Sequence, residues 1–228
     1  MNPELLPRNT AALEALLAKG VRMAVPLSVE IGEDVDVGRI SGDGVVLHPG
    51  TRIRGAATVV SAGCELGREA PVTIEDCRLG RDVRLAGGYA ARATFLDGAT
   101  LGLGHHVREG TLLEEQASGA HCVGLKQTIL MPFVTLGSLV NFCDCLMAGG
   151  TSRREHSEVG SAYIHFNFTP GGDKTTPSLF GDVPRGVMVR DKAIFLGGQG
   201  GAVGPVQVAY GATIGAGCVV QTHLFHDR

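Results

Sequence analysis

The sequence predicts an all-β protein that folds as a parallel β-helix, and three observations support this prediction. Aliphatic residues recur every six positions near the C-terminus and again in several stretches nearer the N-terminus. A Gly often follows the recurring aliphatic residue, as in Ile31-Gly32, Val37-Gly38 and Ile214-Gly215. Gly is also abundant, at 34 of 228 residues, which is about twice its usual share.

The six-residue step fits neither the 3.6-residue period of a helix nor the two-residue period of an ordinary strand. A short constant period is typical of a solenoid, and three steps close one triangular coil of roughly 18 residues. A β-sandwich is disfavoured because its strands are longer and alternate with period two. The recurring positions are Val25, Ile31, Val37, Leu47, Ile53, Val59, Leu79, Leu85, Ala91, Leu101, Val107, Leu113, Leu196, Ala202, Val208, Ile214 and Val220.

The N-terminal segment predicts a short helix over residues 10–19, TAALEALLAK. Asn9 or Thr10 can cap its start, and Gly20 ends it. Its apolar residues are expected to cover the first open coil, because the end of a solenoid exposes core and backbone edges. We therefore divide the chain into a capping helix at 1–20 and a β-helix domain at 21–228.

The six-residue rhythm fails in two regions, around 147–160 and 168–192, where we predict loop insertions at the corners of the coils. These regions and their borders are rich in side chains capable of catalysis and binding, whereas the flanking segments are mostly small and aliphatic. Binding groups commonly lie on loops held by a rigid scaffold, and solvated loops with incidental charges are the alternative. The residues concerned are His156, Glu158, His165, Asn167 and Lys174.

Composition limits the possible partners. The net charge of −3 argues against general nucleic-acid binding, and no apolar run is long enough to span a membrane. The N-terminus lacks the pattern of a signal peptide, and the six Cys form no regular framework. We therefore expect a cytoplasmic protein with reduced thiols, no nucleic-acid partner and no membrane association.

Several motifs resemble the acetyltransferase domain of the bifunctional N-acetylglucosamine-1-phosphate uridyltransferases, a hexapeptide-repeat family. The run NFTPGGDKTT from Asn167 is similar to that family's Asn-Tyr-Asp-Gly loop with its following Lys, and HHVREGTLLEEQASGAHCVGLKQT is similar to its Arg-Pro-Gly coil and later Lys pair. Stand-alone proteins related to UDP-N-acetylglucosamine pyrophosphorylase are more similar still. The resemblance covers nearly the whole chain and implies a left-handed β-helix.

The resemblance also implies a function. It suggests a CoA-dependent acyltransferase that transfers an acetyl group to nitrogen or oxygen of an amino sugar, sugar phosphate or nucleotide sugar. Acetyl-CoA or another acyl-CoA would be the co-substrate, and the active form would be a homotrimer with sites between subunits. On this alignment Arg108, Lys126, Asn167 and Lys174 fall on residues that bind the sugar substrate.

Two departures from the family pattern qualify this expectation. The nucleotidyltransferase domain has no counterpart in these 228 residues, so we expect no pyrophosphorylase activity. The family's catalytic His has no match either, because it should fall near LGSLVNFCDCLMAG, where this sequence offers Asn141 and Phe142, with Asp144 close by. An Asn does not act as a general base at neutral pH, and we assign Asn141 and Asp144 to substrate binding.

Acyl transfer needs a base that takes the proton of the attacking amine or hydroxyl, and a His is the usual choice. We predict His156 as this base, with Glu158 or Asp144 orienting its ring, and His165 as the second candidate. Backbone N–H groups or an Asn would meet the developing oxyanion. The acyl-CoA arm is expected to lie over small residues of the C-terminal coils, namely Gly197, Ala212 and Ala216.

Two other functions stay open at this point. A zinc site using Cys143, Cys145, His156 and His165 is disfavoured because Cys-x-Cys lacks the usual spacing, and we predict no metal. His105 and His106 are a poor pair for one site, because adjacent strand residues point to opposite sides. The alternative function is a sugar-phosphate or nucleotide-sugar binding protein, or a non-acyl sugar-modifying enzyme on the same scaffold. A purely structural β-helix is the third possibility.

Overall fold

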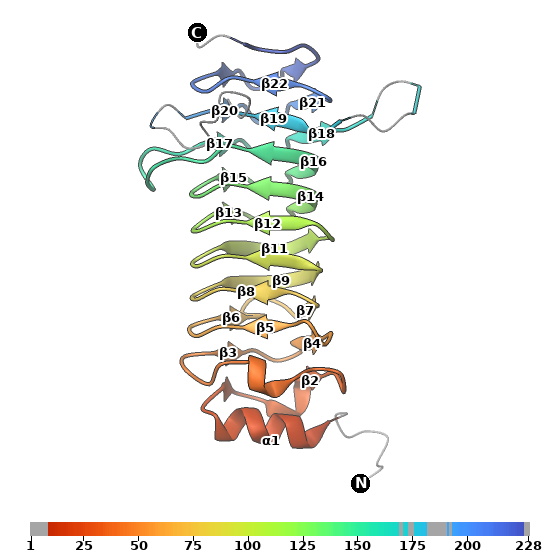
Figure 1. Cartoon of the computed structure of the whole chain (residues 1–228), viewed down its shortest axis with the longest axis vertical. Helices are drawn as coiled ribbons and strands as arrows, with labels where there is room; N and C mark the ends of the chain where they lie inside the picture. Colours follow the sequence, from red (N-terminus) through yellow and green to blue (C-terminus); the bar gives the residue numbers. More distant parts are fainter. Residues whose placement is uncertain (1–8, 169–170, 173–175, 182–190, 192, 226–228) are drawn as a thin grey trace.

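The computed structural model describes residues 9–168, 171–172, 176–181, 191 and 193–225. These residues form stacked parallel coils, and every named strand belongs to one continuous 24-stranded sheet. The coils rise from the helix α1 at one end to the C-terminal strands at the other (Figure 1). The predicted parallel β-helix is therefore confirmed.

Each coil has three faces, and each face is a ladder of parallel strands. Face 1 contains β1 (Arg22–Met23), β3 (Val46–Leu47), β6 (Glu65–Leu66), the first parts of β9 (Arg84–Ala91) and β11 (Thr100–Val107), β13 (Ser118–Gly119), β15 (Thr135–Leu136), β17 (Glu158–Val159), β20 (Phe195–Leu196) and β23 (Thr213–Ile214). Face 2 contains β2 (Glu30–Ile31), β4 (Arg52–Arg54), β7 (Val72–Glu75), the last parts of β9 and β11, the first parts of β14 (Gly124–Leu130) and β16 (Asn141–Met147), β18 (Ile164–Phe166), β21 (Gly201–Val203) and β24 (Val219–Val220). Face 3 contains β5 (Val59–Val60), β8 (Arg78–Leu79), β10 (Ala93–Phe95), β12 (Thr111–Leu113), the last parts of β14 and β16, β19 (Ser178–Phe180) and β22 (Gln207–Val208).

The core is a column of inward aliphatic residues that runs through the whole stack. Most of the predicted positions lie in it, including all five of the C-terminal series. Three of the predicted positions are not buried in it: Val25 is 50% exposed, Val37 is only partly buried, and Val60 rather than Val59 is buried. The coil between Ile53 and Val60 is one residue longer than the period, and a slip of one residue reverses the side to which a strand residue points.

The corners need backbone in the left-handed region. Gly55 has φ of +87°, and a Cβ there would lie 2.5 Å from the backbone nitrogen of Asp76 on the next coil. At the same corner of higher coils the chain uses Asp76, Gln127 and Asp144, all with positive φ. Asp is one of the few other residues that adopt this conformation readily. The corner therefore depends on backbone geometry more than on Gly alone.

The helix α1 (Thr10–Ala18) caps the first coil, as predicted. The Asn9 side chain accepts a hydrogen bond from the backbone N–H of Ala12 at 3.2 Å, and Leu13 and Leu16 are buried in the core. Two short 3₁₀ turns, η2 (Pro26–Ser28) and η3 (Val37–Arg39), follow in the first coils. The open end of the core is thus covered by the helix's apolar side.

The interruptions of the rhythm occur at two different corners. Residues 148–157 connect β16 on face 3 to β17 on face 1, and β19 on face 3 is likewise followed along the chain by β20 on face 1. Residues 167–177 connect β18 on face 2 to β19 on face 3. The corner between faces 3 and 1 is the vertex opposite face 2, so the segment 148–157 lies at a different edge from the corner that follows β18 (Figure 1).

Candidate functional site

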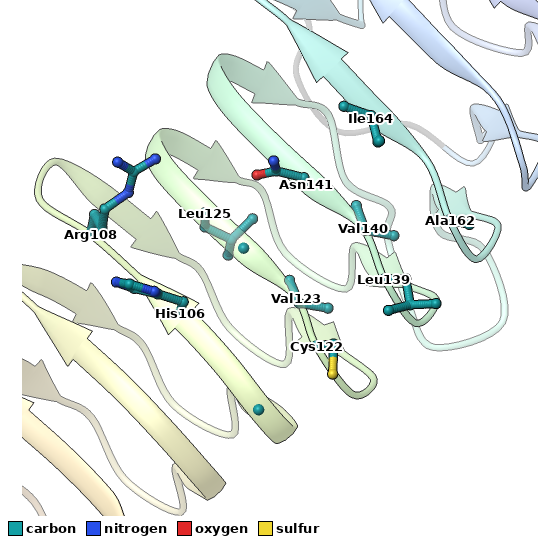
Figure 2. Close-up of a pocket in the computed structure, with 12 residues that line it drawn as sticks. His106, Arg108, Cys122, Val123, Leu125, Leu139, Val140, Asn141, Ala162 and Ile164 are labelled. Carbon is teal, nitrogen blue, oxygen red and sulfur yellow. The ribbon is translucent and has the colours of Figure 1, made fainter.

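A groove of about 570 Å³ opens on face 2 and along the edge where faces 1 and 2 meet. Figure 2 shows its lining side chains on β11, β14, β16 and β18. Its polar lining comes from His106, Arg108 and Asn141, beside the thiol of Cys122. The remaining lining is apolar or Gly, so the few polar groups would fix the orientation of a ligand.

The strand register explains why the groove is open. His106 pairs with Gly124, and Gly124 pairs with Asn141, so the three residues form one column along face 2. Strands in a sheet lie about 4.8 Å apart, which puts His106 and Asn141 about 10 Å from each other. Gly124 leaves the floor between them without a side chain, and a Cβ there would lie 3.1 Å from Asn141 Oδ1.

Positive charge gathers beside this column. Arg108 directly follows the end of β11, two residues after His106, and both side chains are exposed. No residue that the structure describes forms an ion pair with Arg108. Lys126 Nζ and Arg92 each lie 3.5 Å from a carboxylate oxygen of Glu109. Two cations therefore share the Glu109 carboxylate and Arg108 lies beside them without an ion pair to a described residue, which leaves the region suited to an anionic ligand.

The pKa of the Glu109 carboxyl is lowered from its usual value. A hydrogen bond from its own backbone N–H is the largest cause that lowers the pKa of Glu109, and the charges of Lys126 and Arg92 lower it further. Because the side chain is exposed, solvent screens these charges and they contribute little to the stability of the fold.

Asp144 lies at the next corner beyond the groove. Its Oδ2 accepts a hydrogen bond from the Cys143 thiol at 3.1 Å. Burial is the main cause that raises the pKa of Cys143, Asp144 adds to it, and the charges of Lys126 and Arg108 oppose it. The structure thus brings together four of the residues predicted from the sequence, namely Arg108, Lys126, Asn141 and Asp144.

His165 points into the coil instead of the groove. It is 2% exposed and packs edge-on against the rings of Phe142 and Phe180. Its Nδ1 lies 2.8 Å from the carbonyl oxygen of Cys143, so Nδ1–H donates, and Nε2 lies 2.7 Å from Ser178 Oγ. Burial lowers the pKa of His165, although the hydrogen bond to Cys143 opposes the shift. The ring is a neutral, hydrogen-bonded part of the core.

Asn167 lies close to His165, as its position two residues later predicts, but both are inside the coil. Asn167 is 6% exposed. A Cβ on Gly204 of the next coil would lie 2.6 Å from Ser178 Oγ, 2.9 Å from His165 Nε2 and 3.1 Å from Asn167 Oδ1. The third residue predicted for this loop, Lys174, lies outside the described residues.

His156 and Glu158 lie away from the groove within one chain. His156 belongs to the segment between β16 and β17, at the vertex opposite face 2, and its Nδ1 is buried without a hydrogen-bond partner among the described residues. Glu158 is exposed on face 1, where β17 pairs with β15 and β20. The hexad pattern does not bring these two side chains to Arg108.

The three residues predicted for the acyl-CoA arm lie in the C-terminal coils. Ala212 is 7% exposed at the start of β23. A Cβ on Gly197 would lie 2.4 Å from the backbone nitrogen of Ala216, so these two coils are in direct backbone contact. Ala216 is exposed at the edge between faces 1 and 2, the same edge that lines the groove two coils earlier at Ala162.

Sequence reasoning missed His106 as a groove residue. The prediction that His105 and His106 face opposite sides is confirmed, because His105 is 1% exposed and His106 is exposed. The missed signal was the spacing of His106 from Arg108, since residues two apart on a strand share a side.

The described residues hold neither a candidate metal site nor a candidate membrane-spanning helix. Among residues 9–225 outside the gaps given above, no three His, Cys, Asp or Glu side chains gather in a set that could hold a metal ion. Within the same described residues, no helix has both the length and the apolar character that crossing a bilayer requires.

Comparison with known proteins shows similarity to bifunctional GlmU proteins, and no family model matches the chain. The chain is 29% identical over 224 residues to GlmU of Xanthomonas campestris pv. campestris, covering 92% of this chain and 41% of that protein. It is 29% identical over 208 residues to GlmU of Thermotoga petrophila, covering 91% of this chain and 41% of that protein. The chain spans about two fifths of the length of these curated relatives. The parallel solenoid and this similarity fit a hexapeptide-repeat family that resembles GlmU.

Proposed function

We propose that this protein transfers an acyl group from acyl-CoA to the amine or hydroxyl of a sugar phosphate or nucleotide sugar bound on face 2. One observation carries the proposal: a groove with a glycine floor holds an Arg108 guanidinium that forms no ion pair with any described residue, next to the Asn141 amide. The resemblance to sugar-phosphate acetyltransferases and the similarity to GlmU proteins support the same reaction class.

The residues have distinct roles in this proposal. Arg108 would hold the phosphate through a bidentate contact, and Lys126 would add charge beside it. The open floor at Gly124 would accept the sugar ring. The Asn141 amide would donate a hydrogen bond to the thioester oxygen as it becomes an oxyanion. The acyl-CoA arm would run along the edge between faces 1 and 2 toward Ala216.

A groove on the surface of one chain also suits a second wall from another subunit. Apolar side chains are exposed on and beside face 2, including Leu139, Ile164, Phe166 and Val219, at 38–57%. Such side chains favour subunit contacts, and the homotrimer that the resemblance implies would supply them. In that assembly His156 and Glu158 would reach the groove only as residues of a neighbouring copy.

The second candidate function is sugar-phosphate or nucleotide-sugar binding without acyl transfer. The observation that favours it is the position of the predicted bases, since neither His165 nor His156 lines the groove of its own chain. The two functions share the anion site and differ only in whether acyl-CoA reacts there.

Calorimetry with acetyl-CoA and a panel of hexosamine phosphates and UDP-sugars, together with release of free CoA thiol, separates these functions. The wild type should bind one sugar ligand and acetyl-CoA, and it should release thiol only when both are present. Light scattering should give the molar mass of three chains. Gly124→Val should abolish sugar binding because it fills the floor. Ser118→Val, outward on face 1 of the same coil, is the control. Sugar binding without thiol release would favour the second function, and binding of neither ligand would overturn both.

A further inference from the structure

We infer that His106 is the general base of this acyl transfer, an inference that rests on the proposed function. His106 is exposed, lines the groove, and stands on the same column as Asn141 with only Gly124 between them. A group attached to a sugar on the glycine floor would therefore meet the imidazole on one side and the Asn141 amide on the other (Figure 2).

The anion site fixes how the acceptor would lie. Arg108 directly follows β11 and is two residues after His106, which puts their Cα atoms about 7 Å apart for extended backbone. A phosphate held by Arg108 would leave the rest of the sugar to extend over Gly124, within reach of His106. The base, the anion site and the amide thus surround one ring-sized space.

Neighbouring side chains hold the His106 ring in place. The Tyr89 ring meets it edge-on, with ring centroids 5.4 Å apart and an interplanar angle of 80°. The Tyr89 hydroxyl donates to Glu75 Oε2 at 3.3 Å, and burial followed by the charge of Glu75 raises the pKa of Tyr89. The ring of His106 is therefore supported on the side away from Gly124.

The other histidines near these coils make hydrogen bonds outside the groove. His105 points into the core, and its Nδ1 lies 3.0 Å from the carbonyl oxygen of Gly102. His121 Nδ1 lies 2.8 Å from Ser138 Oγ. His165 is held inside the coil by Cys143 and Ser178.

The reaction balances with these groups. The acceptor nitrogen or oxygen attacks the thioester carbonyl and forms the new C–N or C–O bond of a tetrahedral intermediate, and the C–S bond breaks when this intermediate collapses. His106 takes the proton of the acceptor and passes it to the departing CoA thiolate, which leaves as a thiol. The Asn141 amide stabilises the tetrahedral intermediate between these two steps.

The test measures kcat and KM of thiol release for the wild type, His106→Asn, His156→Ala and the control His48→Asn, whose side chain pairs with Glu65 on face 1. His106→Asn should lower kcat about 100- to 10,000-fold, the range for loss of a general base, with little change in KM for the sugar. Added imidazole should restore part of the rate, because the groove is open to solvent. His48→Asn should keep the wild-type kcat, and His156→Ala tests the rival base.

Each outcome has a distinct meaning. Unchanged kcat in His106→Asn, or loss of kcat in His156→Ala alone, would overturn the assignment of His106 and leave the proposed function standing. Absence of thiol release by the wild type with every acceptor would overturn the proposed function and this base together. A folded His106→Asn variant, shown by an unchanged thermal transition, with lost kcat and imidazole rescue supports the inference.

Discussion

Two groups of polar residues lie on the same ladder of face 2, but their side chains point to opposite sides of the sheet. His106, Arg108 and Asn141 point outward and line a groove, whereas His165 and Asn167 point inward and are at most 6% exposed. The outward group lies in regular coils, and the inward group lies where the rhythm fails. In a solenoid, stacking alone brings residues 17 or 18 positions apart side by side, so a functional site needs no insertion.

The position of each residue within its strand causes this difference. Asn141 pairs with Ile164 in the column that also holds His106, while His165 stands one residue later, in line with buried Ala202. One step along a strand reverses the side on which the side chain lies. The same imidazole is thus a solvent-facing group in one column and a core group in the next.

Core truncation beneath the inward group should have the largest effect on stability. Phe142 is fully buried and stacks on Phe180 with centroids 5.9 Å apart, so Phe142→Ala should lower the free energy of unfolding by about 3–5 kcal/mol. Chemical denaturation measures this. Ile164→Ala, outward on the same face, is the matched control and should lose far less. Equal losses would contradict the division between inward and outward columns.

Replacing the inward His should have an intermediate effect that depends on pH. His165→Phe leaves the Cys143 carbonyl and the Ser178 hydroxyl without this partner, which should cost about 1–3 kcal/mol near pH 7. Because burial lowers the pKa of folded His165, the unfolded chain binds this proton more tightly. The wild type should therefore keep this stability above about pH 6.5, the ordinary His pKa, and lose it as the pH falls through the lower folded pKa.

Denaturation curves of the wild type and His165→Phe between pH 4 and 8 measure this difference. The variant should show a weaker decline of unfolding free energy on acidification, and the decline caused by His105, whose pKa burial also lowers, should persist in both proteins. Parallel curves for the two proteins would show that His165 does not titrate as its surroundings predict.

Replacing an outward residue should have the smallest effect on stability and a large one on binding. Arg108→Ala should change the free energy of unfolding by less than about 0.5 kcal/mol. It should weaken binding of a sugar phosphate about 10- to 100-fold, as expected for loss of a charged hydrogen bond of roughly 1.5–3 kcal/mol. Calorimetry of both properties, with outward Arg78→Ala on face 3 as control, tests this. Unchanged affinity would place the anion elsewhere.

Much of the fold could be predicted because the chain repeats one physical requirement. Each face needs one inward aliphatic residue, so Ile214 and Val220 mark the coils without any knowledge of their contacts. The prediction was wrong at Val59, because the step from Ile53 to Val60 is one residue longer than the six-residue period. The predicted site residues come together in part. Arg108, Lys126, Asn141 and Asp144 lie close to one another, whereas Asn167, which the resemblance grouped with Arg108 and Lys126, is inside the coil, and His106 was not predicted.

The sequence by itself determined the coil, because burying apolar side chains at a fixed spacing leaves the backbone few other ways to close. It also predicted that the rhythm fails around 147–160 and 168–192. Only the tertiary structure decided that the segment 148–157 lies at the vertex opposite face 2 and that His165 points inward. The physical reason is that side and edge depend on the register between neighbouring coils, which hydrogen bonds between distant residues set and no local pattern records.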